Sequence, residues 1–115
     1  MLNIPKTVKV GGHIQTVEIL DTINGGNETG LYKATQDRIL IAKHVLSEKG
    51  KKELIDISES FIQLTFLHEL LHAINFIFSG DSLSEKEIDH ISEGLFQVMV
   101  DNPCIFTRGK NAKTR

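Results

Sequence analysis

Hydrophobic and polar residues alternate along the first forty positions, which is the pattern of short, half-buried strands. The stretches KTVKV and HIQTVEIL flank Gly11-Gly12 and predict two strands joined by a tight hairpin turn. NGGNETG, residues 24–30, has the composition of a loop. Residues 31–42, LYKATQDRILIA, predict two more strands that turn near Thr35-Gln36-Asp37. The most apolar strand, Arg38 to Ala42, is expected at the centre of the sheet or next to an active site.

A helical period begins near Lys52, after the solvated linker Ser47–Lys52. It continues through ELIDISESFIQLTFLHELLHAINFIF and ends at Ser79-Gly80, glycine being common after the last turn of a helix. The apolar positions Leu64, Leu67, Leu70, Leu71, Ile74, Ile77 and Phe78 cover most directions of a helical wheel. We therefore expect this helix to be buried on more than one side.

A second helix is predicted to start at Ser84, because Ser84-Glu85-Lys86-Glu87 has the form of a capping box. Its apolar stripe is Ile88, Ile91, Leu95, Val98 and Met99, and Asp101-Asn102-Pro103 ends it. These elements predict an α+β protein, with a small N-terminal antiparallel sheet packed on two long C-terminal helices. Residues 1–103 are expected to form one domain, followed by a flexible basic tail at 104–115.

Composition restricts the class of protein further. The chain has 115 residues, 40% of them hydrophobic and 24% charged, and a net charge of −2. No basic excess favours nucleic-acid binding, and no signal peptide or uninterrupted apolar span predicts a membrane location. The single cysteine, Cys104, fits a reducing compartment. We expect a cytoplasmic protein whose partner is a protein or peptide substrate. Its oligomeric state stays open.

The motif HELLH, residues 68–72, places charged and titratable groups inside an apolar helix. Residues four apart share one helix face, so His68 and His72 can direct their imidazoles at one ion. Glu69 lies about 100° away around the helix, where a general base can hold a water beside that ion. The H-E-x-x-H spacing on a helix is typical of zinc peptidases for this reason.

Zinc requires a third protein ligand, and the acids and histidine of the second helix are the candidates: Glu85, Glu87, Asp89, His90 and Glu93. Two helices packed antiparallel across the turn at residues 80–83 would bring His72 opposite residues 88–93. This depth argument favours Asp89 as the metal ligand, with Glu93 as the alternative ligand or a supporting residue, and disfavours Glu85.

HELLHAINF together with IDHISEGLF resembles the gluzincin peptidases, of which thermolysin is an example. In that family the second helix carries a zinc-binding glutamate and, four residues later, an aspartate that hydrogen-bonds a ligating histidine. Asp89 and Glu93 match this E-x-x-x-D pattern with the acids exchanged. The same stretch resembles the small ImmA/IrrE-type metallopeptidases. Residues 30–103 as a whole resemble metallopeptidase-like proteins encoded by bacteriophages, which would place the chain in the host cytoplasm.

The resemblance implies a minimal zincin-like domain that hydrolyses peptide bonds with zinc-activated water and Glu69 as the general base. It also implies an edge strand that pairs with the substrate, for which residues 38–42 are the candidate. His90, His44, His13 and Tyr32 are available to stabilise the oxyanion, and the sequence does not select among them. The alternatives are a metal-containing but catalytically inactive protein-binding module and a hydrolase of small amides or esters.

Overall fold

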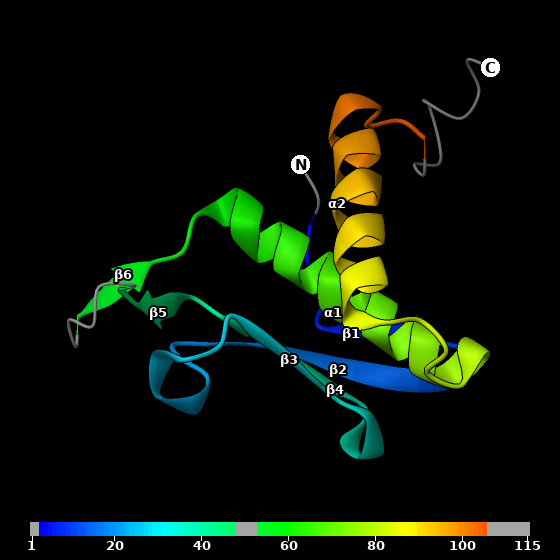
Figure 1. Cartoon of the computed structure of the whole chain (residues 1–115), viewed down its shortest axis with the longest axis horizontal. Coiled ribbons are helices and arrows are strands. Elements are labelled where there is room, and N and C mark those ends of the chain that lie inside the picture. Colours follow the sequence, from blue (N-terminus) through cyan, green and yellow to red (C-terminus); the bar gives the residue numbers. More distant parts are fainter. Residues whose placement is uncertain (1–2, 48–52, 106–115) are drawn as a thin grey trace.

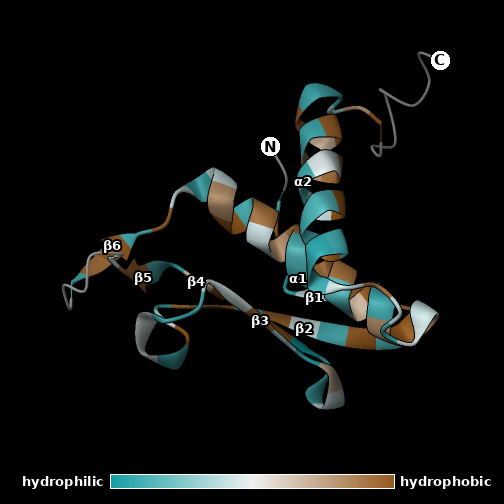
Figure 2. Ribbon diagram, in the orientation of Figure 1, coloured by the Kyte–Doolittle hydropathy of each residue, from teal (hydrophilic) through white to brown (hydrophobic). Residues whose placement is uncertain are grey.

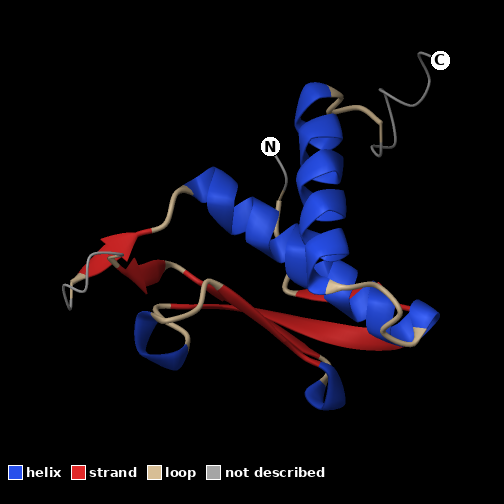
Figure 3. Ribbon diagram, viewed as in Figure 1, coloured by secondary structure: helices blue, strands red, loops and turns tan. Residues whose placement is uncertain are grey.

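The computed structural model describes residues 3–47 and 53–105, and it shows a four-stranded sheet, a two-stranded sheet and two long helices (Figures 1 and 3). The larger sheet contains β1 (Thr7–Val10), β2 (His13–Leu20), β3 (Gly30–Lys33) and β4 (Arg38–Ala42). Short 3-10 turns at Asn24–Gly26 and Ala34–Gln36 flank β3. The helices, α1 (Glu59–Ser79) and α2 (Glu85–Asp101), follow the strands in sequence. The α+β class is therefore confirmed.

The larger sheet is mixed, whereas the sequence predicted an antiparallel one. Its strand order is β1-β2-β4-β3, and β2 pairs with β4 in parallel, with Thr16 opposite Arg38. The β1–β2 and β3–β4 hairpins are antiparallel, as predicted. Residues 39–42 of β4 are all buried, and a strand that is apolar on both faces belongs inside a sheet. β4 therefore takes the inner position beside β2.

The central position of β4 corrects the expectation that residues 38–42 form a substrate-pairing edge. Both sides of this strand are already hydrogen-bonded, to β2 and to β3. The edge strand on that side of the sheet is β3.

The core lies on both faces of β4. On one face Ile39 and Ile41 are fully buried and pack with Val17 and Phe66, which brings α1 against the sheet. On the other face Leu40 and Ala42 pack with Ile23. A fully buried side chain of this size contributes roughly 1.5–3 kcal/mol to folding. The contact between β4 and α1 therefore fixes the helix that carries the histidines.

The first helix begins later than the sequence predicted. Leu54–Asp56 form strand β6, which pairs with β5 (His44–Leu46) in a small antiparallel sheet. Ser58 is the N-cap of α1 and its hydroxyl accepts a hydrogen bond from the Phe61 amide. Residues 48–52 of the predicted linker and residues 106–115 of the predicted tail lie outside the described residues.

The end of α1 and the start of α2 follow the prediction. Gly80 caps α1 with φ +56°, and Ser84 and Glu87 form the capping box of α2. Asn75, which is 3% exposed, holds the turn between them. Its amide donates to the Leu83 carbonyl and accepts from the Leu83 amide, each at 3.1 Å. The turn therefore has a fixed conformation that places the first residues of α2 beside α1.

Helix α2 leaves α1 after its first turns and projects away from the sheet (Figure 1). Ile88 is fully buried at the start of its apolar stripe, but Ile91 is 45% exposed and Val98 is 42% exposed. Figure 2 shows hydrophilic residues along much of the helix. Only the N-terminal part of α2 is thus in a position to contribute to a site with α1.

By length and composition alone, α1 also qualifies as a candidate membrane span. Buried core helices of soluble proteins meet the same criterion. In this structure Phe66, Leu67 and Ala73 of α1 are buried, and the helix packs on β3 and β4. Its apolar composition is accounted for, at least on that side, by contact with the sheet.

Candidate metal centre

His68 and His72 lie one turn apart in the middle of α1, and their rings face the same space. Their Nε2 atoms are 3.2 Å apart, and the ring centroids are separated by 4.9 Å. The helix determines this arrangement, because side chains at i and i+4 project from the same face. Both side chains are partly buried, at 17% and 26% exposed, so their rotamers are restricted by packing.

Glu85 completes the group from the first position of α2. One carboxylate oxygen lies 2.8 Å from His68 Nε2, and the other lies 2.8 Å from His72 Nε2. Ligand atoms at 2.0–2.1 Å from a tetrahedral zinc are separated by about 3.3 Å from one another. The separations of 2.8–3.2 Å are slightly smaller than this value. These separations involve both oxygens of Glu85; with one ligand atom from each residue, the three atoms lie within 4.8 Å of one another.

Asp89 lies on the opposite side of the His68 ring, with Oδ1 3.0 Å from Nδ1. The contact of His68 Nε2 with Glu85 at 2.8 Å has the geometry of a hydrogen bond, whereas Nδ1 and Asp89 are an ion pair by distance. Which ring nitrogen carries the proton depends on the tautomer of His68. A carboxylate behind a metal-binding histidine is the usual means of fixing its tautomer.

The two predicted residues of the second helix, Asp89 and Glu93, differ in their distance from the histidines. Asp89 contacts His68, whereas Glu93 lines the adjoining pocket without a recorded contact to either histidine. The described group of three that could hold a metal is His68, His72 and Glu85. Glu85, which the depth argument disfavoured, contacts both histidines, because α2 crosses α1 instead of running back along it (Figure 1).

A sequence signal for Glu85 was present. The spacing E-x-x-x-D occurs at Glu85 and Asp89, one turn before the pair that was matched to the gluzincin pattern. Here the acids have the order of that pattern, with glutamate first and aspartate second. The two acids contact different nitrogens of the His68 ring. Asn75, which positions the turn before Glu85, had no comparable signal in the sequence.

Glu69 lies next to the group but on a different side of α1. Its Oε2 is 4.0 Å from His68 Nε2, and the residue is 7% exposed. No hydrogen bond to its carboxylate is recorded within the described part of the chain. Burial, followed by the charges of Glu85, Glu28 and Asp89, raises its pKa from 4.5 to about 8. A carboxylate with this pKa is a stronger proton acceptor than an exposed glutamate.

Strand β3 comes very close to Glu69 at Gly30. A Cβ atom added to Gly30 would lie 2.9 Å from Glu69 Oε2 and 2.5 Å from Thr65 Cγ2. Only glycine permits this approach of the strand backbone to the helix. The first residue of β3 therefore covers Glu69 and contributes to its burial.

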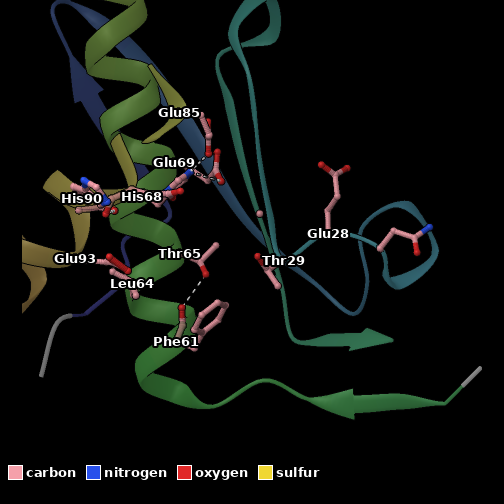
Figure 4. Close-up of a pocket in the computed structure, with 14 residues that line it drawn as sticks. Glu28, Thr29, Phe61, Leu64, Thr65, His68, Glu69, Glu85, His90 and Glu93 are labelled. Atoms are coloured by element: carbon pink, nitrogen blue, oxygen red, sulfur yellow. Dashed lines mark hydrogen bonds and ion pairs between the residues drawn. The ribbon is translucent and has the colours of Figure 1, made fainter. Parts of the chain in front are cut away.

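A pocket of about 670 Å³ adjoins His68 (Figure 4). Residues 27–30 form one wall, α1 contributes Phe61, Leu64, Thr65, His68 and Glu69, and α2 contributes Glu85, Asp89, His90, Ser92 and Glu93. Of the four candidates for oxyanion stabilisation, His90 lines this pocket. Tyr32 instead packs against Phe76, and His44 pairs with Asp56 at 3.0 Å. His13 begins β2 and is exposed.

Comparison with known proteins finds no matching family model, curated protein or solved structure. The function is therefore inferred from the site itself.

Proposed function

We propose that the chain is a zinc-dependent peptidase, with His68, His72 and Glu85 as the metal ligands and Glu69 as the general base. The observation that carries this proposal is the convergence of two Nε2 atoms and a carboxylate within 4.8 Å of one another, beside a buried glutamate. The arrangement has the components of metal-assisted hydrolysis, namely a ligand set, a base and an adjoining pocket.

The donor set suits zinc. Two imidazole nitrogens and one carboxylate are a common combination at catalytic zinc sites, where a fourth position is left for water or substrate. In the described part of the chain no fourth protein ligand joins the group, since Glu93 and His90 only line the pocket. A zinc ion bound here would act as a Lewis acid and lower the pKa of a water molecule toward about 7. Asp89 would hold His68 in the tautomer that leaves Nε2 as the ligand atom.

Glu69 is placed to move protons. It lies beside the ligand set without belonging to it, and its carboxylate lines the pocket. As the general base, Glu69 takes a proton from the attacking water as the new C–O bond forms. It then donates this proton to the leaving amine nitrogen as the C–N bond breaks, so that it returns to its carboxylate form.

We assign β3, in place of the predicted residues 38–42, as the edge strand that pairs with the substrate. Among the described strands it pairs with β4 alone, and Gly30 at its start covers Glu69. An extended peptide that added to β3 as another strand would pass the site, with main-chain hydrogen bonds holding it.

The second candidate is a metal-containing, catalytically inactive protein-binding module. The exposed apolar side chains of α2, Ile91, Val98 and Val100, favour it, because such residues can bind another protein. The number of ligands argues against this candidate, because a structural zinc site usually has four protein ligands and the described group has three.

The decisive variant is Glu69→Gln, which keeps the shape of the side chain and removes its basicity. Zinc-loaded wild type and Glu69→Gln should each contain about one zinc per chain by elemental analysis. Glu69→Gln should hydrolyse peptides about 10²- to 10⁴-fold more slowly. His68→Ala is the contrasting variant and should lose the metal. A wild-type protein that holds zinc and cleaves nothing in a proteome-derived peptide library would favour the binding module.

A further inference from the structure

The pocket beside the metal centre is strongly acidic. Five carboxylates line it: Glu28, Glu69, Glu85, Asp89 and Glu93. No lysine or arginine is among the lining residues, although six lie in the described part of the chain, at positions 6, 9, 33, 38, 43 and 86. Even without Glu69, whose pKa is raised by burial, a divalent ion would offset only two of four negative charges. The pocket therefore keeps a negative potential even when the proposed ion is bound.

Two of the carboxylates are not engaged by the metal centre. Glu28 lies on the strand side of the site and Glu93 on the α2 side (Figure 4). Glu28 accepts a hydrogen bond from Asn24, and no basic residue of the described chain pairs with either glutamate. Glu28 lines the pocket together with Gly30, the first residue of β3. It is thus the carboxylate that the strand side of the pocket contributes.

Apolar surface lies next to these charges. Phe61 is 45% exposed although it lines the pocket, and Leu64 lies one turn further along α1. Lysine and arginine side chains combine an aliphatic stem with a cationic end, and the stem packs on apolar surface while the charge pairs with a carboxylate. A cation can also lie over the face of an aromatic ring such as that of Phe61.

We infer that the site acts on peptide segments that carry a lysine or arginine next to the cleaved bond, with Glu28 as the main counter-charge and Phe61 as the apolar contact. This inference rests on the proposed peptidase function and adds the class of substrate. Glu28 would be a specificity-determining residue, because it pairs with the substrate and takes no part in proton transfer.

The test uses three peptides that are identical except for one residue flanking the cleaved bond, which is Lys, norleucine or Glu. The zinc-loaded wild type should favour the Lys peptide over the Glu peptide by roughly 10- to 100-fold in kcat/KM, and added salt should reduce this ratio. Glu28→Gln retains the acceptor for Asn24 and should reduce the ratio several-fold. Glu53→Gln makes the same charge change at an exposed residue outside the pocket and should leave the ratio unchanged.

Binding of the same peptides to zinc-loaded Glu69→Gln, measured by fluorescence anisotropy, separates this inference from the proposed function. Cleavage of the Lys and Glu peptides at equal rates would overturn the inference and leave the peptidase function standing. Tighter binding of the Lys peptide without cleavage by wild type would support the acidic recognition and overturn the peptidase function. Equal binding of the Lys and Glu peptides, with no cleavage by wild type, would overturn both.

Discussion

At the level of single residues, Glu85 and Asp89 share the two nitrogens of His68 but should differ in their effect on metal binding. Glu85→Gln removes the proposed ligand and should weaken zinc binding by at least ~100-fold, whereas Asp89→Asn disturbs only the orientation of His68 and should cost about 10- to 100-fold. Glu93→Gln should leave the affinity nearly unchanged, because no contact joins Glu93 to the histidines. Competition with a chromophoric chelator measures all three affinities.

The opposite order of zinc affinities would identify a different ligand. If Glu93→Gln released the metal while Glu85→Gln retained it, the ligand would be the alternative that the sequence suggested, and α2 would have to rotate to bring Glu93 to the ion.

Gly30 is a second residue on which the site depends. Gly30→Ala should lower the free energy of unfolding by about 1–3 kcal/mol, because the new methyl group overlaps Thr65 Cγ2 and Glu69 Oε2. Chemical denaturation measures this loss. Thr65→Ser removes Cγ2 while keeping the hydroxyl that donates to the Phe61 carbonyl, so it should restore part of the stability. Gly94→Ala is the matched control, since its Cβ meets nothing within 4 Å. It should stabilise α2 slightly.

The residues of the site were readable from sequence to different degrees. His68, Glu69 and His72 follow from helix periodicity alone, because one regular helix determines their relative directions. The spacing of Glu85 and Asp89 is visible in the sequence, but the position of Glu85 at the histidines depends on how two helices cross, which no local pattern specifies. The crossing depends in turn on a buried side-chain contact, that of Asn75 with Leu83.

At the level of elements, the two helix caps have separable roles. Ser84→Ala and Ser58→Ala each remove a hydroxyl that accepts a hydrogen bond from a backbone amide. Each substitution should lower the free energy of unfolding by about 0.5–2 kcal/mol. Ser84 directly precedes the proposed ligand Glu85, so Ser84→Ala should also reduce zinc affinity. Ser58→Ala affects the far end of α1 and should not. Denaturant unfolding combined with zinc titration distinguishes the two effects. Equal zinc affinities would show that the first turn of α2 holds Glu85 without its cap.

Elements with strong local signals were predicted well, and elements that depend on partners were not. The hairpins, the glycine end of α1 and the capping box of α2 each follow from residues close together in sequence. The segment ELIDIS, which contains β6, was interpreted as the start of the helix because its apolar spacing fits both the helical and the strand period. Pairing with β5 decides in favour of the strand. The parallel β2–β4 contact likewise has no local signal.

At the level of the whole molecule, a bound ion would connect the two helices. A ligand that binds only the folded chain stabilises it by about 2.7 kcal/mol at a hundred times its dissociation constant. Chelation of the zinc-loaded protein should therefore lower the melting temperature by on the order of 10 °C for a domain of this size. Differential scanning calorimetry with and without chelator measures the shift. His68→Ala should melt at the same temperature in both conditions. A wild-type curve that chelator leaves unchanged would argue against an occupied site.

The three proposed ligands are close together in sequence as well as in space. His68 and Glu85 are only 17 positions apart, and the intervening residues form one helical hairpin. Contacts between residues so close in sequence form early in folding, because closing the short loop between them costs little conformational entropy. Gly30, which covers Glu69, lies 39 positions before it and depends on the sheet. During refolding, zinc capture should therefore precede the burial of Glu69, and stopped-flow mixing with a zinc indicator should show the metal bound before peptidase activity appears. The metal would then act as a folding template before it acts in catalysis.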